Sequence, residues 1–138
     1  MADTNCRYCI KGTDLAEVVA DLEVSTLYLT KNQSYKGRCI LGFKDHKTEL
    51  FQLTSEELQA FSRDMAKAAK ALYDVFSPNK INYAAFGDTY PHLHFHLVPK
   101  YVDGTDYGST FVMNPQQVYL SEAEYAEIIE LIKGKLAP

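Results

Sequence analysis

The 138-residue sequence contains no tryptophan, only four histidines and three cysteines, and no long apolar run. A helix needs about eighteen consecutive apolar residues to cross a bilayer, so we expect no membrane partner. Acidic residues exceed basic ones: the sequence has 18 Asp and Glu and 14 Lys and Arg, which gives a formal net charge of −4. Nucleic-acid backbones attract basic surfaces, so we also expect no nucleic acid partner. A small phosphate-bearing ligand is still compatible with this charge, since it needs only local donors.

The N-terminal stretch MADTNCRYCI lacks the basic-then-apolar form of a secretory signal. We therefore expect a cytoplasmic protein, in a reducing compartment where three cysteines do not form a disulfide framework. Two of them form Cys6-Arg-Tyr-Cys9, a spacing that suits a redox pair, half of a zinc site or a chance arrangement. Cys39 lies within the apolar stretch RCILGF and is expected in the core.

The length and the 46% hydrophobic content favour one globular domain over residues 1–138. Apolar residues at three- and four-residue steps predict a long helix over 54–76 and a second over 121–133. Thr54 with Glu57, and Ser121 with Glu124, have the spacing of a capping box, and Gly134 is a plausible helix stop. The remaining apolar stretches predict strands at residues 17–20, 25–29, 38–43, 81–87 and 92–98.

Short links join these strands, which favours antiparallel pairing. The fold class is therefore α+β: an antiparallel sheet of about five strands, with the long helix packed on it and a C-terminal helix. Residues 102–120 have no clean period, and we expect them to form a loop that covers part of the molecule.

The segment PHLHFHLVPK, residues 91–100, holds three of the four histidines at alternate positions. On a strand, His92, His94 and His96 share one face, roughly 6.5 to 7 Å apart, while the apolar residues between them face the core. Three uses are open: a polar outer face, a catalytic metal site, or nucleophilic attack on phosphorus by a neutral imidazole with its neighbours in support. Histidine suits the last because its ordinary pKa near 6.5 leaves much of it unprotonated at neutral pH.

The stretch His92-Leu-His94-Phe-His96-Leu-Val98 resembles the His-φ-His-φ-His-φ-φ signature of the histidine triad (HIT) superfamily, where φ is an apolar residue. Over residues 6–101, the segments KNQSYKGRCILGFKDH, LTSEEL and INYAAFGDTYPHLHFHLVPK are similar to bacterial HIT proteins. The resemblance implies a HIT-like fold, a purine nucleotide or nucleotide conjugate as ligand, and hydrolysis or transfer of a nucleotidyl group. It also implies a homodimer, with the helix at 55–76 and neighbouring strand edges as the expected interface, and no organic cofactor.

By the same resemblance, His94 is the nucleophile toward the α-phosphorus and forms a covalent nucleotidyl-histidine. His96 then contacts the phosphate and assists proton transfer. The residues expected to bind the substrate are Asn32 at the ribose, Asn82, Gly87 where the backbone approaches the ligand, Thr89 at a phosphate oxygen, and Arg38.

Arg38 departs from the family pattern, since relatives often have a Gly-His pair where this chain has Gly37-Arg38. Arginine can contact phosphate as a permanent cation, but it does not shuttle protons as histidine does. This substitution motivates an alternative, a nucleotide-sensing or scaffold protein with little turnover. A hydrolase with a catalytic metal on the triad is a third hypothesis.

Some HIT proteins, and the related galactose-1-phosphate uridylyltransferases, bind zinc at positions that are filled here by Cys6, Cys9, His46 and His92. A closed set of two cysteines and two histidines is typical of a structural zinc site, which would tie the N-terminal segment to the sheet. The alternative is a pair of free thiols with a solvated His46.

Overall fold

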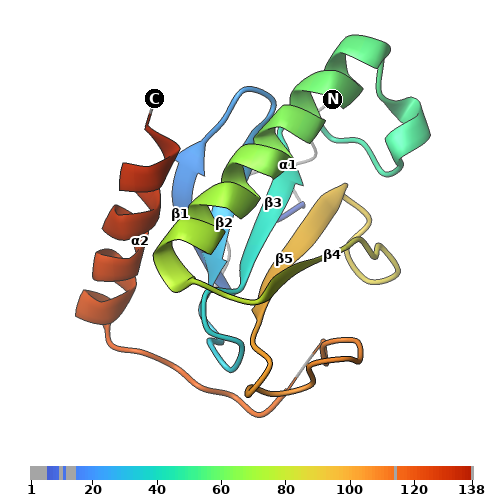
Figure 1. Ribbon diagram of the computed structural model, residues 1–138. Coiled ribbons are helices and arrows are strands. Elements are labelled where there is room, and N and C mark those ends of the chain that lie inside the picture. Colours follow the sequence, from blue (N-terminus) through green and yellow to red (C-terminus); the bar gives the residue numbers. More distant parts are fainter. Residues whose placement is uncertain (1–5, 10, 12–14, 114, 138) are drawn as a thin grey trace.

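The computed structural model describes residues 6–9, 11, 15–113 and 115–137. Its five strands form one antiparallel sheet in the order β1-β2-β3-β5-β4 (Figure 1). The strands are β1 (Ala16–Asp21), β2 (Ser25–Thr30), β3 (Cys39–Phe43), β4 (Lys80–Ala84) and β5 (His94–Lys100). The predicted α+β class and antiparallel sheet are confirmed.

Two helices cover one face of this sheet (Figure 1). Both α1 (Ser55–Phe76) and α2 (Glu122–Leu136) begin at the expected capping boxes, with Thr54 and Ser121 as N-caps. A short 3-10 helix, η1 (Leu50–Gln52), precedes α1 and was not anticipated from the sequence. Within the described part of the chain, neither helix combines the length and the apolar character that crossing a membrane requires.

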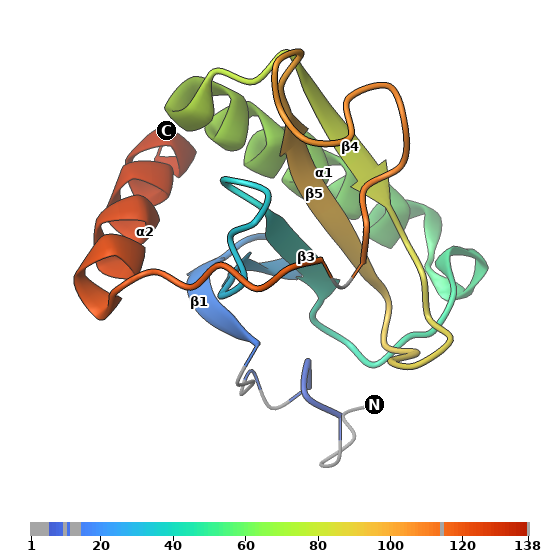
Figure 2. The ribbon, with the colours of Figure 1, turned by 90° about the horizontal axis from the view of Figure 1, so that it is seen from below.

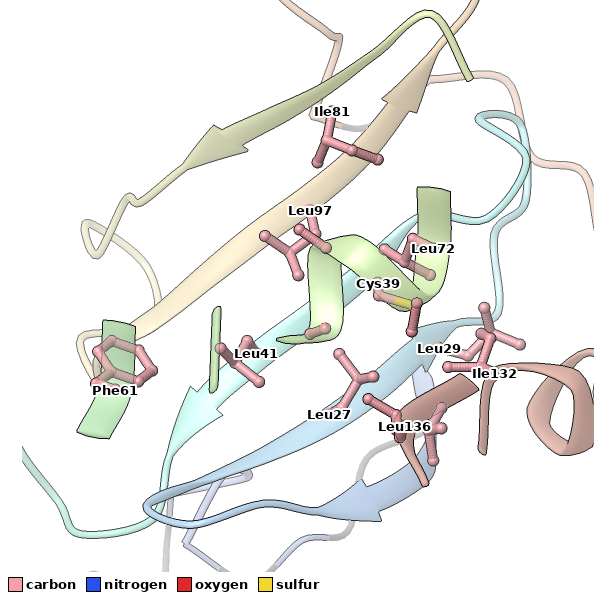
Figure 3. Close-up of a cluster of buried hydrophobic side chains, with 14 of the residues drawn as sticks. Leu27, Leu29, Cys39, Leu41, Phe61, Leu72, Ile81, Leu97, Ile132 and Leu136 are labelled. Atoms are coloured by element: carbon pink, nitrogen blue, oxygen red, sulfur yellow. The ribbon is translucent and has the colours of Figure 1, made fainter. Parts of the chain in front are cut away.

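The main core lies between the helices and the sheet (Figure 3). Leu27, Leu41 and Leu97 are fully buried strand residues that face this layer, and Cys39 is buried with them as predicted. Alternation along the strands sends the intervening side chains to the opposite face. That face carries a smaller buried cluster made by Tyr8, Ala16, Tyr28 and Ile40.

In the described part of the chain, segments without helical structure cover the opposite face. Tyr8, from the N-terminal segment, packs edge to face on Tyr28 with ring centroids 5.7 Å apart. Residues 102–113 and 115–120, the covering segment, run from β5 toward α2 beneath the sheet (Figure 2). The β2–β3 loop holds this segment, because the Gln33 N–H donates to the Val118 carbonyl at 2.8 Å and the Val112 N–H donates to the Tyr35 hydroxyl at 2.8 Å.

Three predicted boundaries were wrong. Gly134 does not stop the last helix, which continues to Leu136 because Leu136 buries its side chain in the core. Strand β5 begins at His94, so His92 lies just before it rather than on it. The predicted strand 81–87 also ends early, at Ala84, and Phe86 instead lies near the His96 ring, with centroids 6.2 Å apart.

Candidate active site and metal centre

Four side chains distant in sequence meet next to the N-terminal segment. The ligand atoms of Cys6, Cys9, His46 and His92 all lie within 4.8 Å of one another. The His92 Nδ1 atom is 3.2 Å from Cys6 Sγ, 3.4 Å from Cys9 Sγ and 3.2 Å from His46 Nδ1. Cys9 Sγ is also 3.2 Å from His46 Nδ1. We call these four residues the Cys/His cluster.

The orientation of His92 directs one ring nitrogen into this cluster. Its Nε2 atom lies 2.5 Å from the Phe43 carbonyl oxygen. A carbonyl can only accept, so Nε2–H donates and, in the neutral ring, Nδ1 keeps its lone pair. Burial lowers the pKa of His92, which favours this neutral form. A histidine that donates one N–H to a carbonyl and offers the other nitrogen is the usual geometry of a metal ligand.

The donor set fits a tetrahedral metal ion. With metal–ligand distances of about 2.0 to 2.3 Å, tetrahedral ligand atoms lie about 3.3 to 3.8 Å apart. Four of the six separations within the cluster, at 3.2 to 3.4 Å, come close to that range, and all six lie within 4.8 Å. Two thiols and two imidazoles, with four protein ligands, match a structural rather than a catalytic centre. Among the described residues, this is the one set of candidate ligands, and it includes neither His94 nor His96.

His94 starts β5 and pairs with Gly42 of β3. Its Nδ1 atom lies 2.6 Å from the His92 carbonyl oxygen, so Nδ1–H donates and the Nε2 lone pair is available in the neutral ring. The ring is buried, which lowers its pKa below the ordinary value. Tyr8 stacks on it, with centroids 4.6 Å apart and planes inclined by 24°.

His96 and Arg38 adjoin His94 on the same face. The His94 and His96 ring centroids are 5.3 Å apart, and Arg38 Nη2 lies 3.4 Å from His96 Nδ1. A guanidinium can only donate, so His96 accepts at Nδ1 and carries its proton on Nε2. Burial, followed by the Arg38 charge and by His94, lowers the pKa of His96 to about 3. His96 is therefore a neutral hydrogen-bond donor at physiological pH.

The two histidines open into a cavity of about 400 Å³, large enough for a small ligand. The sequence-predicted residues that line it are His94, His96, Arg38, Asn32, Gly87 and Thr89. The covering segment closes one side through Met113, Pro115, Gln117 and Tyr119, so the expectation that it covers something is confirmed. We call this cavity the histidine pocket.

Two of the predicted ligand-binding residues have other partners. Asn82 on β4 is not among the lining residues, and its amide oxygen lies 3.3 Å from Lys100 Nζ as an acceptor. Asn32 lines the pocket, but its amide oxygen also accepts from the Ser34 N–H at 3.2 Å and the Val118 N–H at 3.1 Å. The structure thus brings Asn32 to the site and holds Asn82 outside it.

Several lining residues were missed from the sequence. Arg7 and Tyr8 reach the pocket from between the two cysteines, and Arg7 lies over the Tyr90 ring at 3.9 Å and donates to its hydroxyl at 2.9 Å. Their place in the sequence could have predicted this position. Arg7 and Tyr8 lie between Cys6 and Cys9, and both cysteines contact His92, next to the other triad histidines. No sequence pattern around Met113 predicted that it would line the pocket.

Comparison with known proteins identifies the family and the fold. The sequence model of the HIT domain family matches residues 12–103, and the chain belongs to that family. The general class of function is therefore nucleotide binding or hydrolysis.

Individual relatives are distant. Protein hit of Bacillus subtilis (strain 168) is 26% identical over 114 residues, which cover 78% of this chain and 79% of that protein. A histidine triad protein from Bradyrhizobium japonicum has a TM-score of 0.83 at 18% identity, over 90% of this chain and 92% of that chain. A Plasmodium falciparum diadenosine triphosphate hydrolase, in complex with cyclomarin A, has a TM-score of 0.66 at 18% identity, over 86% and 74%. These two solved structures share the fold.

Proposed function

We propose that this protein is a nucleotidyl hydrolase or transferase that cleaves its substrate at the α-phosphorus through a covalent intermediate on His94. The main support is the hydrogen bond from His94 Nδ1 to the His92 carbonyl, at 2.6 Å, because it leaves Nε2 as the nucleophilic atom. A neutral, buried imidazole facing a cavity of about 400 Å³ suits attack on a nucleotide phosphate. Diadenosine triphosphate hydrolysis by one structural neighbour is chemistry of this kind.

The neighbouring residues support specific steps. His96 carries a proton on Nε2 and lies beside His94, so it can donate a hydrogen bond to a phosphate oxygen. Thr89 and Gly87 line the pocket where the backbone leaves β4, which suits phosphate contacts by a hydroxyl and by main-chain N–H groups. Asn32 is placed for a ribose hydroxyl. We leave Asn82 out of the proposed ligand set because it lies outside the pocket.

A substrate panel tests the proposal. The protein would be incubated with adenosine phosphoramidates and dinucleoside polyphosphates, with and without chelator, and a labelled nucleotidyl-protein would be trapped by acid-free denaturation. We expect turnover with a trapped adduct, and no requirement for added metal. Turnover without an adduct, in wild type, would contradict the covalent route, and immediate loss of chemistry on chelation with the fold intact would favour a metal hydrolase.

A second function, nucleotide sensing with little turnover, is favoured by one observation. Arg38 occupies the position where relatives often carry a proton-shuttling histidine. Burial, followed by the Arg38 charge, lowers the pKa of the adjacent His96 and keeps it neutral. Tight nucleotide binding without adduct or turnover for any member of the panel would select this function over the first.

We also propose that the Cys/His cluster holds a structural zinc ion. Cys6, Cys9, His46 and His92 would be its four ligands, and the ion would fix the N-terminal segment, with Tyr8, against the sheet. Elemental analysis of protein purified without added metal should give one zinc per chain. A metal-free protein of equal thermal stability would contradict the proposal.

We also propose a cytoplasmic location, as expected from the sequence.

We propose a homodimer as well, with its interface at the edge of the sheet. β4 is an edge strand, and Leu58 of α1 and Tyr83 of β4 border an apolar groove of about 440 Å³. We expect Tyr83→Lys to weaken dimerisation, measured by sedimentation, while Leu131→Lys on exposed α2 surface leaves it unchanged. A monomeric wild-type mass at micromolar concentration would contradict the dimer.

A further inference from the structure

Arg38 is a buried cation with no negative partner among the described residues. Only 5% of the residue is exposed, although it lines the histidine pocket. Its Nη1 donates to the Met113 carbonyl at 3.2 Å, and Nη2 lies 3.3 Å from Met113 Sδ and 3.4 Å from His96 Nδ1. The guanidinium also lies over the Phe111 ring at 5.0 Å. Every one of these partners is electrically neutral.

The charge is incompletely satisfied within the described part of the chain. The Nε atom of Arg38 is buried there and has no hydrogen-bond partner. The ion pairs found among the described residues, from Lys11–Asp21 to Lys133–Glu130, do not involve Arg38. Removing a charge from water is costly unless an opposite charge accompanies it. A buried guanidinium facing a ligand cavity therefore favours a ligand that brings negative charge.

The position of Arg38 relates that charge to the reaction. Tyr8, His94, His96 and Arg38 lie in succession across the pocket: Tyr8 stacks on His94, the His94 and His96 centroids are 5.3 Å apart, and Arg38 bonds to His96. An anion at Arg38 is therefore separated from the attacking nitrogen by one side chain. This spacing suits a phosphate that is joined to the α-phosphoryl group rather than the α-phosphoryl group itself.

We propose that Arg38 forms an anion subsite for the leaving group, and that the enzyme prefers nucleotides that release phosphate or polyphosphate over those that release an amine. This inference rests on the function proposed above and names its substrate class. The Met113 carbonyl and thioether, which contact Arg38 now, exchange for phosphate oxygens when such a substrate binds. Those oxygens are stronger acceptors for a guanidinium, because both partners are then charged.

The chemistry of the leaving group points the same way. When His94 Nε2 attacks, an N–P bond forms and the bond from the α-phosphorus to the bridging oxygen breaks. The electron pair leaves on that oxygen, so a polyphosphate departs as an anion and needs no proton. An amine, by contrast, must take up a proton as the P–N bond breaks, and neither Arg38 nor neutral His96 is a ready source. Water then cleaves the N–P bond, giving nucleoside monophosphate, free imidazole and a proton to solvent.

The test compares two substrates in matched variants. The ratio of kcat/KM for diadenosine triphosphate to kcat/KM for adenosine 5′-phosphoramidate would be measured for wild type, Arg38→Gln, Arg38→His and Arg38→Lys. We expect the ratio to fall about tenfold or more in the Gln and His variants, and to be largely kept by Lys, which retains the charge. Lys31→Gln is the matched control, since Lys31 also lines the pocket but has Glu17 at 3.8 Å, and it should change the ratio less than about threefold.

A binding measurement separates this inference from the proposed function. Affinity for inorganic tripolyphosphate would be determined calorimetrically on His94→Ala and on His94→Ala combined with Arg38→Gln, after circular dichroism has shown both to be folded. We expect the affinity to drop about tenfold or more in the double variant. An unchanged affinity, or an unchanged substrate ratio in Arg38→Gln, would overturn the anion subsite. Absence of turnover and adduct in wild type would instead overturn the proposed function, while an Arg38-dependent affinity would still support the subsite.

Discussion

The Cys/His cluster and the histidine pocket use two neighbouring histidines in opposite ways. His92 donates from Nε2 to the Phe43 carbonyl and turns Nδ1 toward the cluster. His94 donates from Nδ1 to the His92 carbonyl and leaves Nε2 for the pocket. Two residues of the same type, two positions apart, thus differ because each finds a different backbone acceptor. The carbonyl that binds one nitrogen decides which nitrogen is left for chemistry.

The two regions also differ in how they balance charge. The cluster brings together two thiols and two imidazoles, a set that suits a cation. The pocket contains Arg38, a permanent cation among neutral partners, which suits an anion. Tyr8 joins the regions, since its ring stacks on His94 and lies 5.6 Å from the His92 ring. Damage to the cluster should therefore be measurable in the pocket.

The largest effect is expected for His94→Ala. Removing the nucleophile should lower turnover by about a thousandfold or more and abolish the trapped adduct. Metal content and melting temperature should stay close to those of wild type, because the lost group acts in the pocket and not in the cluster. His96→Ala, the control beside it, should slow turnover less and weaken phosphate binding. An adduct on His94→Ala protein would show that another residue is the nucleophile.

His92→Ala should mainly affect the Cys/His cluster. His92 is one of the four ligands proposed for zinc, and the binding of a structural metal is coupled to folding. Its loss should therefore lower the zinc content and reduce the melting temperature by about 10 °C. Activity should fall as well, since Tyr8 is no longer fixed against His94. Cys39→Ala is the matched control, because it removes a buried thiol outside the cluster and should keep the metal. If His92→Ala retains zinc, the ligand assignment is wrong.

Substitutions of Tyr8 probe the connection between the regions. We expect Tyr8→Leu to lower kcat about tenfold with zinc retained, because His94 loses the ring that holds its orientation. Tyr8→Phe should remain close to wild type, since the stacked ring and not the hydroxyl makes the contact. Steady-state kinetics with zinc analysis of both variants is the measurement. Equal losses in Leu and Phe variants would assign the role to the hydroxyl instead.

The smallest effect is a pH dependence of stability. The pKa of His96 is lowered to about 3 in the folded protein, so between about pH 6.5 and that value the unfolded chain binds more protons. Stability is therefore lost as the pH falls through this window, by up to about 1.4 kcal/mol per pH unit for this one group. His96→Gln should show a shallower loss in denaturant unfolding between about pH 6.5 and 5, at equal zinc content. Parallel pH profiles for the two proteins would contradict the assignment.

Local sequence patterns predicted most of the architecture. Capping boxes fixed the starts of both helices at Thr54 and Ser121, because they depend on residues three positions apart. Alternation placed Leu93 and Leu97 in the core and His94 and His96 on the other face. The Gly134 stop failed because helix propensity is a weak local preference, which burial of Leu136 outweighs.

The sequence by itself determined the antiparallel sheet, through apolar stretches joined by short links, and the family, through the triad motif. The four candidate metal ligands came from the resemblance to HIT proteins, because the Cys6-x-x-Cys9 spacing alone left several uses open. Only the tertiary structure decided which nitrogen of His92 and of His94 is available, because the Phe43 and His92 carbonyls are placed by strand packing. It likewise excluded Asn82 from the pocket and surrounded Arg38 with neutral partners from the covering segment. Arg38 and Met113, for example, are 75 positions apart, and no local pattern encodes their contact.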